Sequence, residues 1–296
     1  MSLLPTSALF ACLLILEPAL GAQIMDAPRR DIPDDNLAYP VLVTLDNRDT
    51  GSGFYLRTGD RFYLVTARHV LFKISADPSR GKHPFDLKTK TVELLSYPRD
   101  PKEAGRILLK LDLVKLESEG ATKPHPTAEV AVVRIGTVET KGTSWALKPA
   151  EGVEVKELAP SGLVAVAMET ADKLDQVMVA NEVYIFGYPT SLGLKQIPQI
   201  DYERPLLRKG VVAGKNEKLG TIVLDCPAYQ GNSGGAVLEV QRAGLVINFR
   251  VIGVITAFVP FAETWENKTQ GYSTISISNS GYSVAVPMDK VLELTQ

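Results

Sequence analysis

The chain has 296 residues, which is enough for one large or two small hydrophobic cores. Hydrophobic residues make up 45% of it and charged residues 22%, proportions that are ordinary for a soluble globular protein. The formal net charge is −2, which excludes a broadly basic surface of the kind that binds nucleic acid or anionic membranes.

Residues 1–22 predict a cleavable secretory signal peptide. Residues 8–16 form an apolar run that is too short to span a bilayer, and the small residues at 19–22 then provide a cleavage site. No Lys or Arg precedes the apolar run, so an uncleaved hydrophobic tail remains the alternative. We expect a secreted or periplasmic protein with no stable membrane span after signal removal, and a polar lead-in over residues 23–39.

Cysteine content limits how the fold can be stabilised. Cys12 lies in the predicted signal peptide, which leaves Cys226 as the single cysteine of the mature chain. An intramolecular disulfide is then excluded, although the chain is expected to be exported. The hydrophobic core must hold the fold by itself, with Cys226 as a buried small hydrophobic residue. This pattern favours a bacterial envelope or secreted protein over a disulfide-rich animal one.

Residues 40–136 are expected to form a first block of short strands separated by turns. β-Branched and aromatic residues dominate these segments, and Gly and Pro lie between them. Residues 58–60, Thr-Gly-Asp, predict the turn of a hairpin. The strands of this block are predicted at residues 41–45, 53–56, 62–65, 91–95, 106–113 and 130–135.

Residues 181–287 are expected to form a second block of strands. A connection over residues 137–180, with a weak helical stretch around 169–177, separates the blocks, and residues 287–294 predict a short helix with Pro at its start. This organisation predicts an all-β fold rather than alternating βαβ units. The strands of the second block are predicted from residue 183 and at residues 210–213, 221–224, 234–238, 251–255 and 282–286.

Two segments that are far apart in the sequence indicate an activated hydroxyl. Residues 231–235 are Gly-Asn-Ser-Gly-Gly, and residues 66–69 are Thr-Ala-Arg-His after an apolar strand. A serine hydroxyl is a poor nucleophile at neutral pH and needs a base beside it and an oxyanion site in front of it. Glycines let the backbone turn tightly and bring N–H groups toward an oxyanion. Ser233 is therefore the candidate nucleophile and His69 its candidate base.

The alternative interpretation of both residues is structural. Ser233 would then lie in a glycine-rich turn between strands, and His69 would be a buried, hydrogen-bonded histidine. Of the three histidines, His69 alone follows a Thr-Ala-x pattern. His83 and His125 lie in Lys- and Pro-containing stretches that we expect to be exposed loops, which makes them poor candidates for a base.

Together, these segments resemble the chymotrypsin-like serine peptidases, and within them the bacterial branch that includes the HtrA/Deg proteases. The resemblance covers roughly residues 40–295 and implies a peptidase domain over residues 40–296. It implies two six-stranded antiparallel β-barrels with a cleft between them, a short C-terminal helix, and peptide-bond hydrolysis through an acyl-enzyme. Since the chain stops at Gln296, we expect no PDZ module. The segments that carry the resemblance are residues 51–54, 63–70, 183–189, 231–237, 253–258 and 281–287.

The acid of the expected triad departs from the family pattern. The resemblance places it before an apolar-Ala-apolar strand, where Glu129 precedes residues 130–133, Val-Ala-Val-Val. The order His69, Glu129, Ser233 is that of chymotrypsin. Glutamate is one methylene longer than the usual aspartate, so we expect it to tune the site rather than abolish it. The alternatives are that Asp112 serves as the acid, or that the site is inactive.

The resemblance also implies an oxyanion hole formed by the backbone N–H groups of Gly231 and Ser233. The residue before Ser233 is Asn232, where relatives that are activated from zymogens carry an Asp that pairs with a newly cut N-terminus. Asn cannot form this ion pair, so we expect no activation by N-terminal insertion.

The pocket for the substrate residue before the cut is expected to be apolar. Pro227, six residues before Ser233, occupies the position that sets specificity in many relatives, and it carries no charge. Strict cleavage after Lys or Arg is therefore not expected. Together with Thr256, Ala257 and Ala285, Pro227 predicts a small-to-medium apolar pocket for substrate.

The leading hypothesis is an exported serine endopeptidase that acts on proteins or peptides, with a preference for small or apolar residues before the cut. A catalytically weak or inactive homologue that binds peptides or proteins in the same cleft is the main alternative, and an esterase with the same acyl-enzyme chemistry is another. No cofactor or metal is expected, because the histidines have no ligand spacing and one mature cysteine cannot build a thiolate site.

Overall fold

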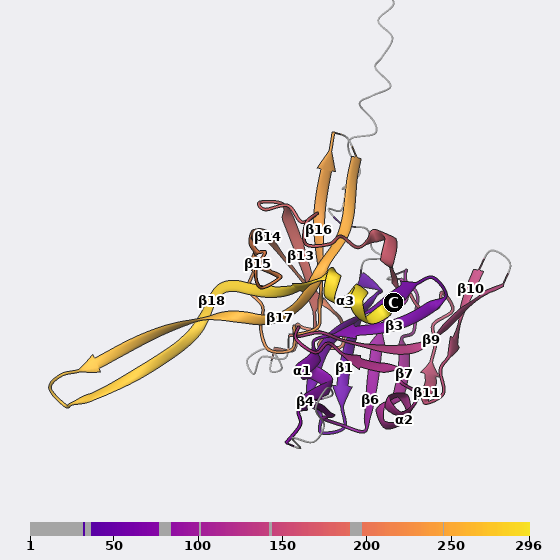
Figure 1. Cartoon of the computed structure of the whole chain (residues 1–296), viewed down its shortest axis with the longest axis horizontal. Helices are drawn as coiled ribbons and strands as arrows, with labels where there is room; N and C mark the ends of the chain where they lie inside the picture. The colour runs from indigo at the N-terminus through magenta and orange to yellow at the C-terminus, as the bar shows by residue number, and fades with distance from the viewer. Residues whose placement is uncertain are drawn as a thin grey trace, which may run out of the picture. The chain divides into compact units, whose positions relative to one another are not determined.

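The structure is a computed structural model that describes Ile32 and residues 37–296, except 77–83, 101, 142–143, 190–196 and 245. Residues 34–296 form one compact unit, and the account below concerns this unit (Figure 1). The predicted signal peptide, most of the predicted lead-in and His83 lie outside the described residues.

A ten-stranded sheet forms the first half of the unit. Its order is β10-β9-β3-β2-β1-β6-β7-β11, with β8 paired to β9 and β12 paired in parallel to β2. This barrel-like sheet has four strands more than the six that we expected, because the predicted connection supplies β10, β11 and β12, and residues 122–124 add β8. The strands are β1 (Pro40–Leu45), β2 (Thr50–Thr58), β3 (Arg61–Thr66), β6 (Thr91–Ser96), β7 (Ile107–Asp112), β8 (Thr122–Pro124), β9 (Ala131–Lys141), β10 (Ser144–Pro149), β11 (Val153–Glu157) and β12 (Val166–Ala167).

The second half is a closed barrel in the order β13-β14-β15-β18-β17-β16. It confirms the predicted all-β fold and the predicted six strands of the second barrel. Helix α3 (Met288–Thr295) follows directly after Pro287, as predicted. The strands are β13 (Glu182–Gly187), β14 (Leu206–Asn216), β15 (Thr221–Asp225), β16 (Ala236–Ala243), β17 (Val246–Asn267) and β18 (Tyr272–Pro287).

Helical structure is sparse in the described residues. The helical stretch that we expected around residues 169–177 is limited to the three-residue 3₁₀ helix η3 (Met168–Thr170). The remaining short elements are α1 (Arg68–Leu71), α2 (Leu113–Ser118) and the two-stranded sheet of β4 (Phe72–Ile74) and β5 (Phe85–Leu87).

Strand β2 joins the two sheets. Its residues 51–56 are all buried, unlike the alternating pattern of a strand with one solvent-facing side. The Ser52 hydroxyl accepts a hydrogen bond from the backbone N–H of Tyr188 at 2.9 Å, and it donates one to the Gly231 carbonyl at 2.6 Å. The loops that follow β13 and β15 are thereby fixed against the first sheet.

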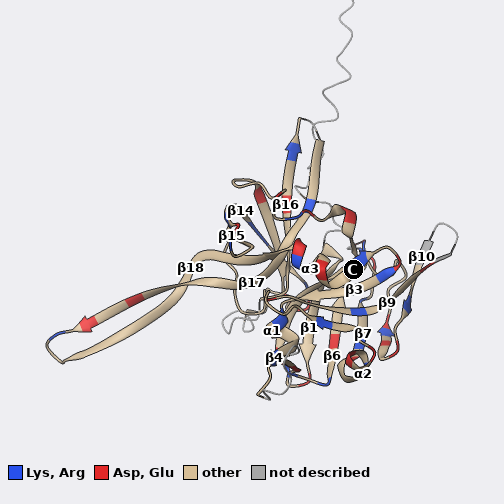
Figure 2. Ribbon diagram, in the orientation of Figure 1, with Lys and Arg blue, Asp and Glu red and all other residues tan. Residues whose placement is uncertain are grey.

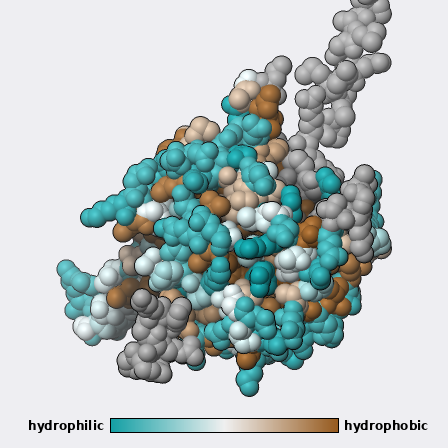
Figure 3. All heavy atoms as spheres, turned by 45° about the vertical axis from the view of Figure 1, so that its right-hand side comes forward, coloured by the Kyte–Doolittle hydropathy of each residue, from teal (hydrophilic) through white to brown (hydrophobic). Residues whose placement is uncertain are grey.

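Strands β17 and β18 are much longer than predicted, with 22 and 16 residues. Beyond the barrel they continue as a two-stranded arm, which Figure 1 shows in orange and yellow. We call residues 258–267 and 272–283 the outer ribbon. On the face shown in Figure 3, hydrophilic residues predominate and apolar ones are scattered among them.

Candidate active site

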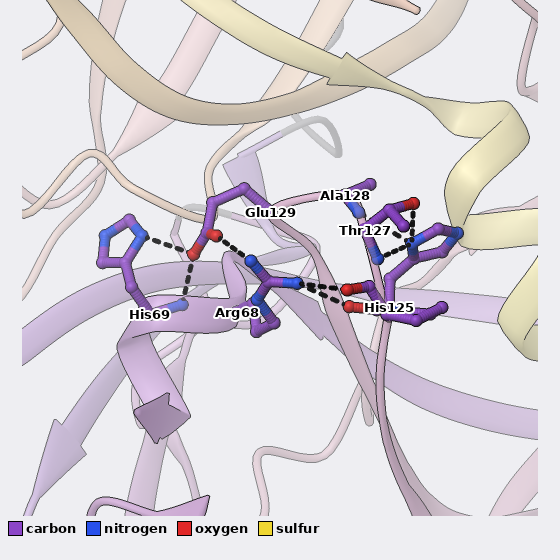
Figure 4. Close-up of polar contacts among 7 residues, drawn as sticks. Arg68, His69, His125, Thr127, Ala128 and Glu129 are labelled. Atoms are coloured by element: carbon purple, nitrogen blue, oxygen red, sulfur yellow. Dashed lines mark hydrogen bonds and ion pairs between the residues drawn. The ribbon is translucent and has the colours of Figure 1, made fainter. Parts of the chain in front are cut away.

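His69 is held in one orientation by Glu129. It lies on α1, directly after β3, where the buried Ala67 precedes the helix. Its Nδ1 lies 3.0 Å from Glu129 Oε1, and its backbone N–H donates to the same oxygen at 2.7 Å (Figure 4). A carboxylate can only accept, so Nδ1 carries the proton and Nε2 keeps its lone pair. This is the tautomer that a general base requires.

Arg68 holds the second oxygen of the same carboxylate. Its guanidinium donates to Glu129 Oε2 at 2.7 Å and to the carbonyl oxygen of His125 at 2.7 Å (Figure 4). The guanidinium also stacks over the Phe85 ring at 4.3 Å. Glu129 therefore lies between two neighbouring residues, with His69 bound to one carboxylate oxygen through two N–H groups and Arg68 bound to the other. Sequence reasoning missed this role of Arg68, although the residue stands next to His69.

The electrostatics favour an ionised Glu129. Burial opposes ionisation, but hydrogen bonds from His69 and the charge of Arg68 outweigh it and lower the pKa of the Glu129 carboxyl. The side chain of Glu129 is 33% exposed and that of Arg68 is 16% exposed. A carboxylate in this position stabilises an imidazolium when His69 takes up a proton.

The alternative acid and base that we considered have structural roles. Asp112 caps α2, where its carboxylate accepts a hydrogen bond from the backbone N–H of Lys115 at 3.0 Å. His125 is buried, which corrects our expectation of an exposed loop. Its Nδ1 accepts from the N–H of Ala128 at 2.8 Å and its Nε2 donates to Glu293 at 2.8 Å, so the ring links this loop to α3.

Ser233 lies in a tight loop that the first sheet holds in place. The backbone N–H of Ser52 donates to the Ser233 carbonyl at 2.9 Å. Gly234 has φ +93°, and a Cβ there would lie 2.0 Å from the Ser52 carbonyl oxygen and 2.3 Å from the Thr66 hydroxyl oxygen. Only glycine fits this approach. The same strands, β2 and β3, therefore position both Ser233 and the helix that carries His69.

Two N–H groups of this loop are available to an oxyanion. The N–H groups of Asn232, Gly234 and Gly235 all donate to carbonyl oxygens at 2.7–2.9 Å. Within the described part of the chain, the N–H groups of Gly231 and Ser233 have no acceptor. These are the two donors that the sequence predicted for the oxyanion hole. The hydrogen bond from Ser52 to the Gly231 carbonyl fixes the orientation of the peptide that follows it.

His69 and Ser233 line a common cavity of about 240 Å³. Among the residues that the structure describes, their side chains share it without a hydrogen bond to each other. Catalytic hydrogen bonds are often long before substrate binds, and they tighten in the complex. The other residues that line the cavity are Ala228, Tyr229, Gln230, Ile255, Thr256, Ala257 and Phe258.

The four predicted pocket residues do not all lie together. Thr256 and Ala257 line the cavity, and the Thr256 hydroxyl donates to the carbonyl oxygen of Val284 at 3.2 Å. Pro227 precedes the lining residue Ala228 but does not line the cavity itself. Ala285 is fully buried in the core of the second barrel, so its position does not support a role in the pocket. Sequence reasoning missed Phe258, which lies at the start of the outer ribbon.

A second, more polar cavity of about 480 Å³ also reaches both His69 and Ser233. Charged side chains line it, and Lys88 donates to the His69 carbonyl oxygen. The two cavities give the site an apolar side and a polar side. The other residues that line the polar side are Leu45, Arg48, Asp49, Thr50, Val70, Gln230 and Gly231.

Nothing described in the structure provides a metal site, since no group of three His, Cys, Asp or Glu residues lies close enough together among the described residues. Cys226 is buried, and burial raises the pKa of its thiol to about 11, so the thiol is inert. No helix in the described part of the chain is long and apolar enough to cross a membrane.

The chain is similar to trypsin-like peptidases in sequence and to HtrA-type proteases in structure. A family model described as trypsin-like peptidase domain matches residues 51–247, which is more than half of the chain. The search of curated proteins returned no match. The solved structure of the HtrA-type protease AlgW with a tripeptide is similar, at 17% identity and a TM-score of 0.44. The crystal structure of Deg5 is similar at 18% identity and a TM-score of 0.46. Both matches cover 88% of this chain, which spans 58% of the length of the AlgW chain and 88% of that of Deg5.

Proposed function

We propose that this chain, which belongs to the trypsin-like peptidase domain family, is a serine endopeptidase that cuts polypeptides through an acyl-enzyme on Ser233. The observation that carries the proposal is the pair of N–H groups at Gly231 and Ser233 that have no acceptor among the described residues, beside a cavity that Ser233 shares with His69. An oxyanion hole requires backbone donors of this kind that are not already bonded within the protein, whereas a structural glycine turn does not.

The proposed chemistry starts at His69. Because Nδ1 donates to Glu129, Nε2 is the basic nitrogen. In acylation, Ser233 Oγ bonds to the carbonyl carbon of the substrate while its proton passes to Nε2, and the N–H groups of Gly231 and Ser233 bind the oxyanion. The C–N bond then breaks as Nε2 returns the proton to the leaving amine. In deacylation, the oxygen of a water molecule bonds to the acyl carbon while Nε2 takes its proton. The bond from the acyl carbon to Ser233 Oγ then breaks as Nε2 returns the proton to Oγ, which releases the acid and restores the serine.

The proposed specificity is for small or apolar residues before the cut. The cavity beside Ser233 is lined by Ala228, Ile255 and Ala257, and Thr256 turns its hydroxyl toward a backbone carbonyl. No Lys, Arg, Asp or Glu is among the lining residues, so a charged substrate side chain would lose its hydration without gaining a partner. Peptide esters that differ in this one residue test the preference, and faster cleavage after Lys than after Ala would contradict it.

Labelling with a fluorophosphonate tests the nucleophile. Wild-type chain is expected to incorporate the probe at Ser233, and Ser233→Ala is expected to abolish labelling. Ser161→Ala serves as the matched control, since Ser161 is an exposed serine away from the cavity. Labelling that survives Ser233→Ala would overturn the assignment.

The second candidate function is peptide binding without turnover. It is favoured by the lack of a hydrogen bond between the side chains of Ser233 and His69 within the described residues. Under this hypothesis, Ser233→Ala would bind an apolar peptide as tightly as wild type does, and neither would release product. Product release by wild type alone assigns the chain to the peptidase hypothesis.

We propose that the protein is exported, since residues 1–22 have the composition of a signal peptide. The expected mature N-terminus lies close to residue 23. N-terminal sequencing of protein from envelope and medium fractions measures it, and a full-length chain in the cytoplasmic fraction would contradict export.

A further inference from the structure

The outer ribbon exposes apolar side chains on both of its faces. It is paired from Phe258 opposite Ser283 to Asn267 opposite Tyr272. Two isoleucines of β18, Ile275 and Ile277, are 66% and 68% exposed. The other large apolar side chains exposed on the ribbon are Phe258, Phe261, Trp265, Tyr272 and Tyr282.

A two-stranded ribbon of this kind is unstable in isolation. A single hairpin is marginally stable in water, and it needs a third strand or a packed face for independent stability. Contiguous exposed apolar surface also marks interaction sites in soluble proteins. A further strand or a packed face would stabilise the ribbon, and its two edges differ in what they can accept.

The outer edge of β17 is protected against pairing. It carries Pro260, Glu263 and Glu266. Proline, charge and irregularity are the devices by which proteins keep an edge strand from pairing with another chain. This edge begins at the catalytic cavity, which Thr256, Ala257 and Phe258 line.

The outer edge of β18 carries neither charge nor proline, and its register irregularity lies near the barrel, where residues 280–282 stand opposite Val259 alone, outside the regularly paired stretch 272–279. Residues 272–283 contain no charged residue and no proline, and Figure 2 shows the corresponding part of β18 without blue or red. Strand β15 covers this edge only at Tyr282–Asp225 and onward into the barrel. Among the described residues, no strand pairs with the outer edge of residues 272–281.

We propose that two copies of this chain associate by antiparallel pairing of these β18 edges, which joins the two ribbons into one four-stranded sheet. The two-fold axis passes through Ser276. This register places Ile275 opposite the partner's Ile277, and Thr274 opposite the partner's Ser278.

The sequence of β18 is complementary to itself in this register. Directly paired residues share one face of a sheet, and Ile275 and Ile277 are paired with Thr264 and Ala262 of β17. Pairing two copies brings four isoleucines together across the axis, flanked by these small side chains. The opposite face carries Thr274, Ser276 and Ser278, whose hydroxyls lie within reach of hydroxyls of the partner.

The absence of charged residues from residues 272–283 favours a second copy of this chain as the partner. In a symmetric antiparallel contact, any charged residue near the axis would meet its own like charge, which is destabilising. Residues 272–283 avoid this over their whole length. The contact also leaves the β17 edge free. The proposal is independent of catalysis.

Sedimentation velocity of the full chain tests the association. Wild type is expected to sediment as a dimer and Ile275→Lys as a monomer, because the new charge would be buried beside the partner's Ile277. The matched control is Thr264→Lys, which adds the same charge to the same face but on β17, away from the axis, and it is expected to remain a dimer. Ile275 is 66% exposed, so its replacement leaves the barrel folded, and the circular dichroism spectrum checks this.

Cysteine cross-linking tests the register. Residues at the axis have directly opposed Cβ atoms about 5 Å apart, close enough for a disulfide, whereas two copies of Ser278 lie roughly 14 Å apart along the strands. With oxidised glutathione, Ser276→Cys is expected to form a covalent dimer and Ser278→Cys is not. The native Cys226 is buried and does not compete.

A monomeric wild type at all concentrations would overturn the proposal. A dimer that resists Ile275→Lys and does not cross-link through Ser276→Cys would place the interface elsewhere. Open-ended polymers would also contradict the proposal, because a two-fold contact between two β18 edges gives a closed dimer. Weaker binding of an apolar peptide by Ile275→Lys, with no change in mass, would assign the ribbon to substrate instead.

Discussion

Replacing Glu129 with glutamine is expected to lower kcat/KM by a factor of about 10²–10⁴. The structure explains the width of this range. The carboxylate accepts from His69 Nδ1 at 3.0 Å, from the His69 backbone at 2.7 Å and from Arg68 at 2.7 Å. A glutamine has one accepting oxygen, so its NH₂ group must face one of these donors.

The orientation of the amide decides the size of the loss. If the NH₂ group faces Arg68, the amide oxygen still orients His69, and only the negative charge that stabilises the imidazolium is lost. We then expect a loss near the lower limit, about 3 kcal/mol of barrier. If the NH₂ group faces His69, the imidazole is driven to the tautomer with the proton on Nε2. The loss then approaches the upper limit, about 5 kcal/mol.

Turnover of a small apolar peptide ester measures the effect, and the rate of fluorophosphonate labelling provides a second measurement. Asp112→Asn is the matched control, because Asp112 is the other acid that the sequence allowed, and asparagine caps a helix as well as aspartate does. The control is expected to keep wild-type turnover. Wild-type turnover in Glu129→Gln would refute the role of Glu129. A large loss of turnover in Asp112→Asn would show that Asp112 is the acid of the triad.

Three further predictions follow from the same contacts. Gly234→Ala is expected to destabilise the fold by at least about 1 kcal/mol and to abolish fluorophosphonate labelling of Ser233, because the added Cβ would overlap the Ser52 carbonyl oxygen and the residue has a positive φ. Urea denaturation measures the loss of stability, and unchanged stability would contradict the prediction. Ser52→Ala is expected to cost about 1–3 kcal/mol and to slow acylation, because it leaves the partly buried Gly231 carbonyl without its donor; burst kinetics would show this, and an unchanged burst rate would contradict it. The pKa of Glu129 is lowered in the folded state, so its ionisation stabilises the fold fully above about pH 4.5, the usual pKa of a glutamate, and this stabilisation is lost as the pH falls through the lower folded-state pKa. Urea midpoints measured from pH 6 to pH 3 are therefore expected to fall more in wild type than in Glu129→Gln. Parallel pH profiles of the two proteins would contradict this.

Strands that pack on a core could be predicted from the sequence, whereas strands that continue into solvent could not. The predicted segment 221–224 and the observed β15 (Thr221–Asp225) agree, because the buried Ile222 and Leu224 alternate with less buried neighbours. In the outer ribbon, Ile275 and Ile277 alternate with serines on β18, but β17 places Trp265 and Phe261 on the opposite face. Its paired positions carry apolar and polar residues on both faces, so neither face resembles the surface of a core.

The candidate site was predictable where its chemistry depends on local spacing. Ser233 and His69 lie in short segments whose composition follows from the tight turn and the strand end that they occupy. The burial of His125 was not predictable, because it depends on Glu293, which lies 168 residues away. Ala285 was misplaced in the pocket because its side chain faces the core of the barrel, and strand register alone decides between these two faces.

Arg68 and Glu129 are best understood as one unit. A glutamate side chain has one more rotatable bond than aspartate, so by itself it would orient His69 less firmly. Arg68 removes this freedom by binding Oε2, while the backbone and ring of His69 bind Oε1. The arginine is in turn fixed by the His125 carbonyl and by the Phe85 ring. Glu129, held at Oε2 by Arg68, thus places Oε1 beside Nδ1 of His69 although its side chain is one methylene longer than that of aspartate. Glutamate in place of the usual aspartate is therefore compatible with an active site.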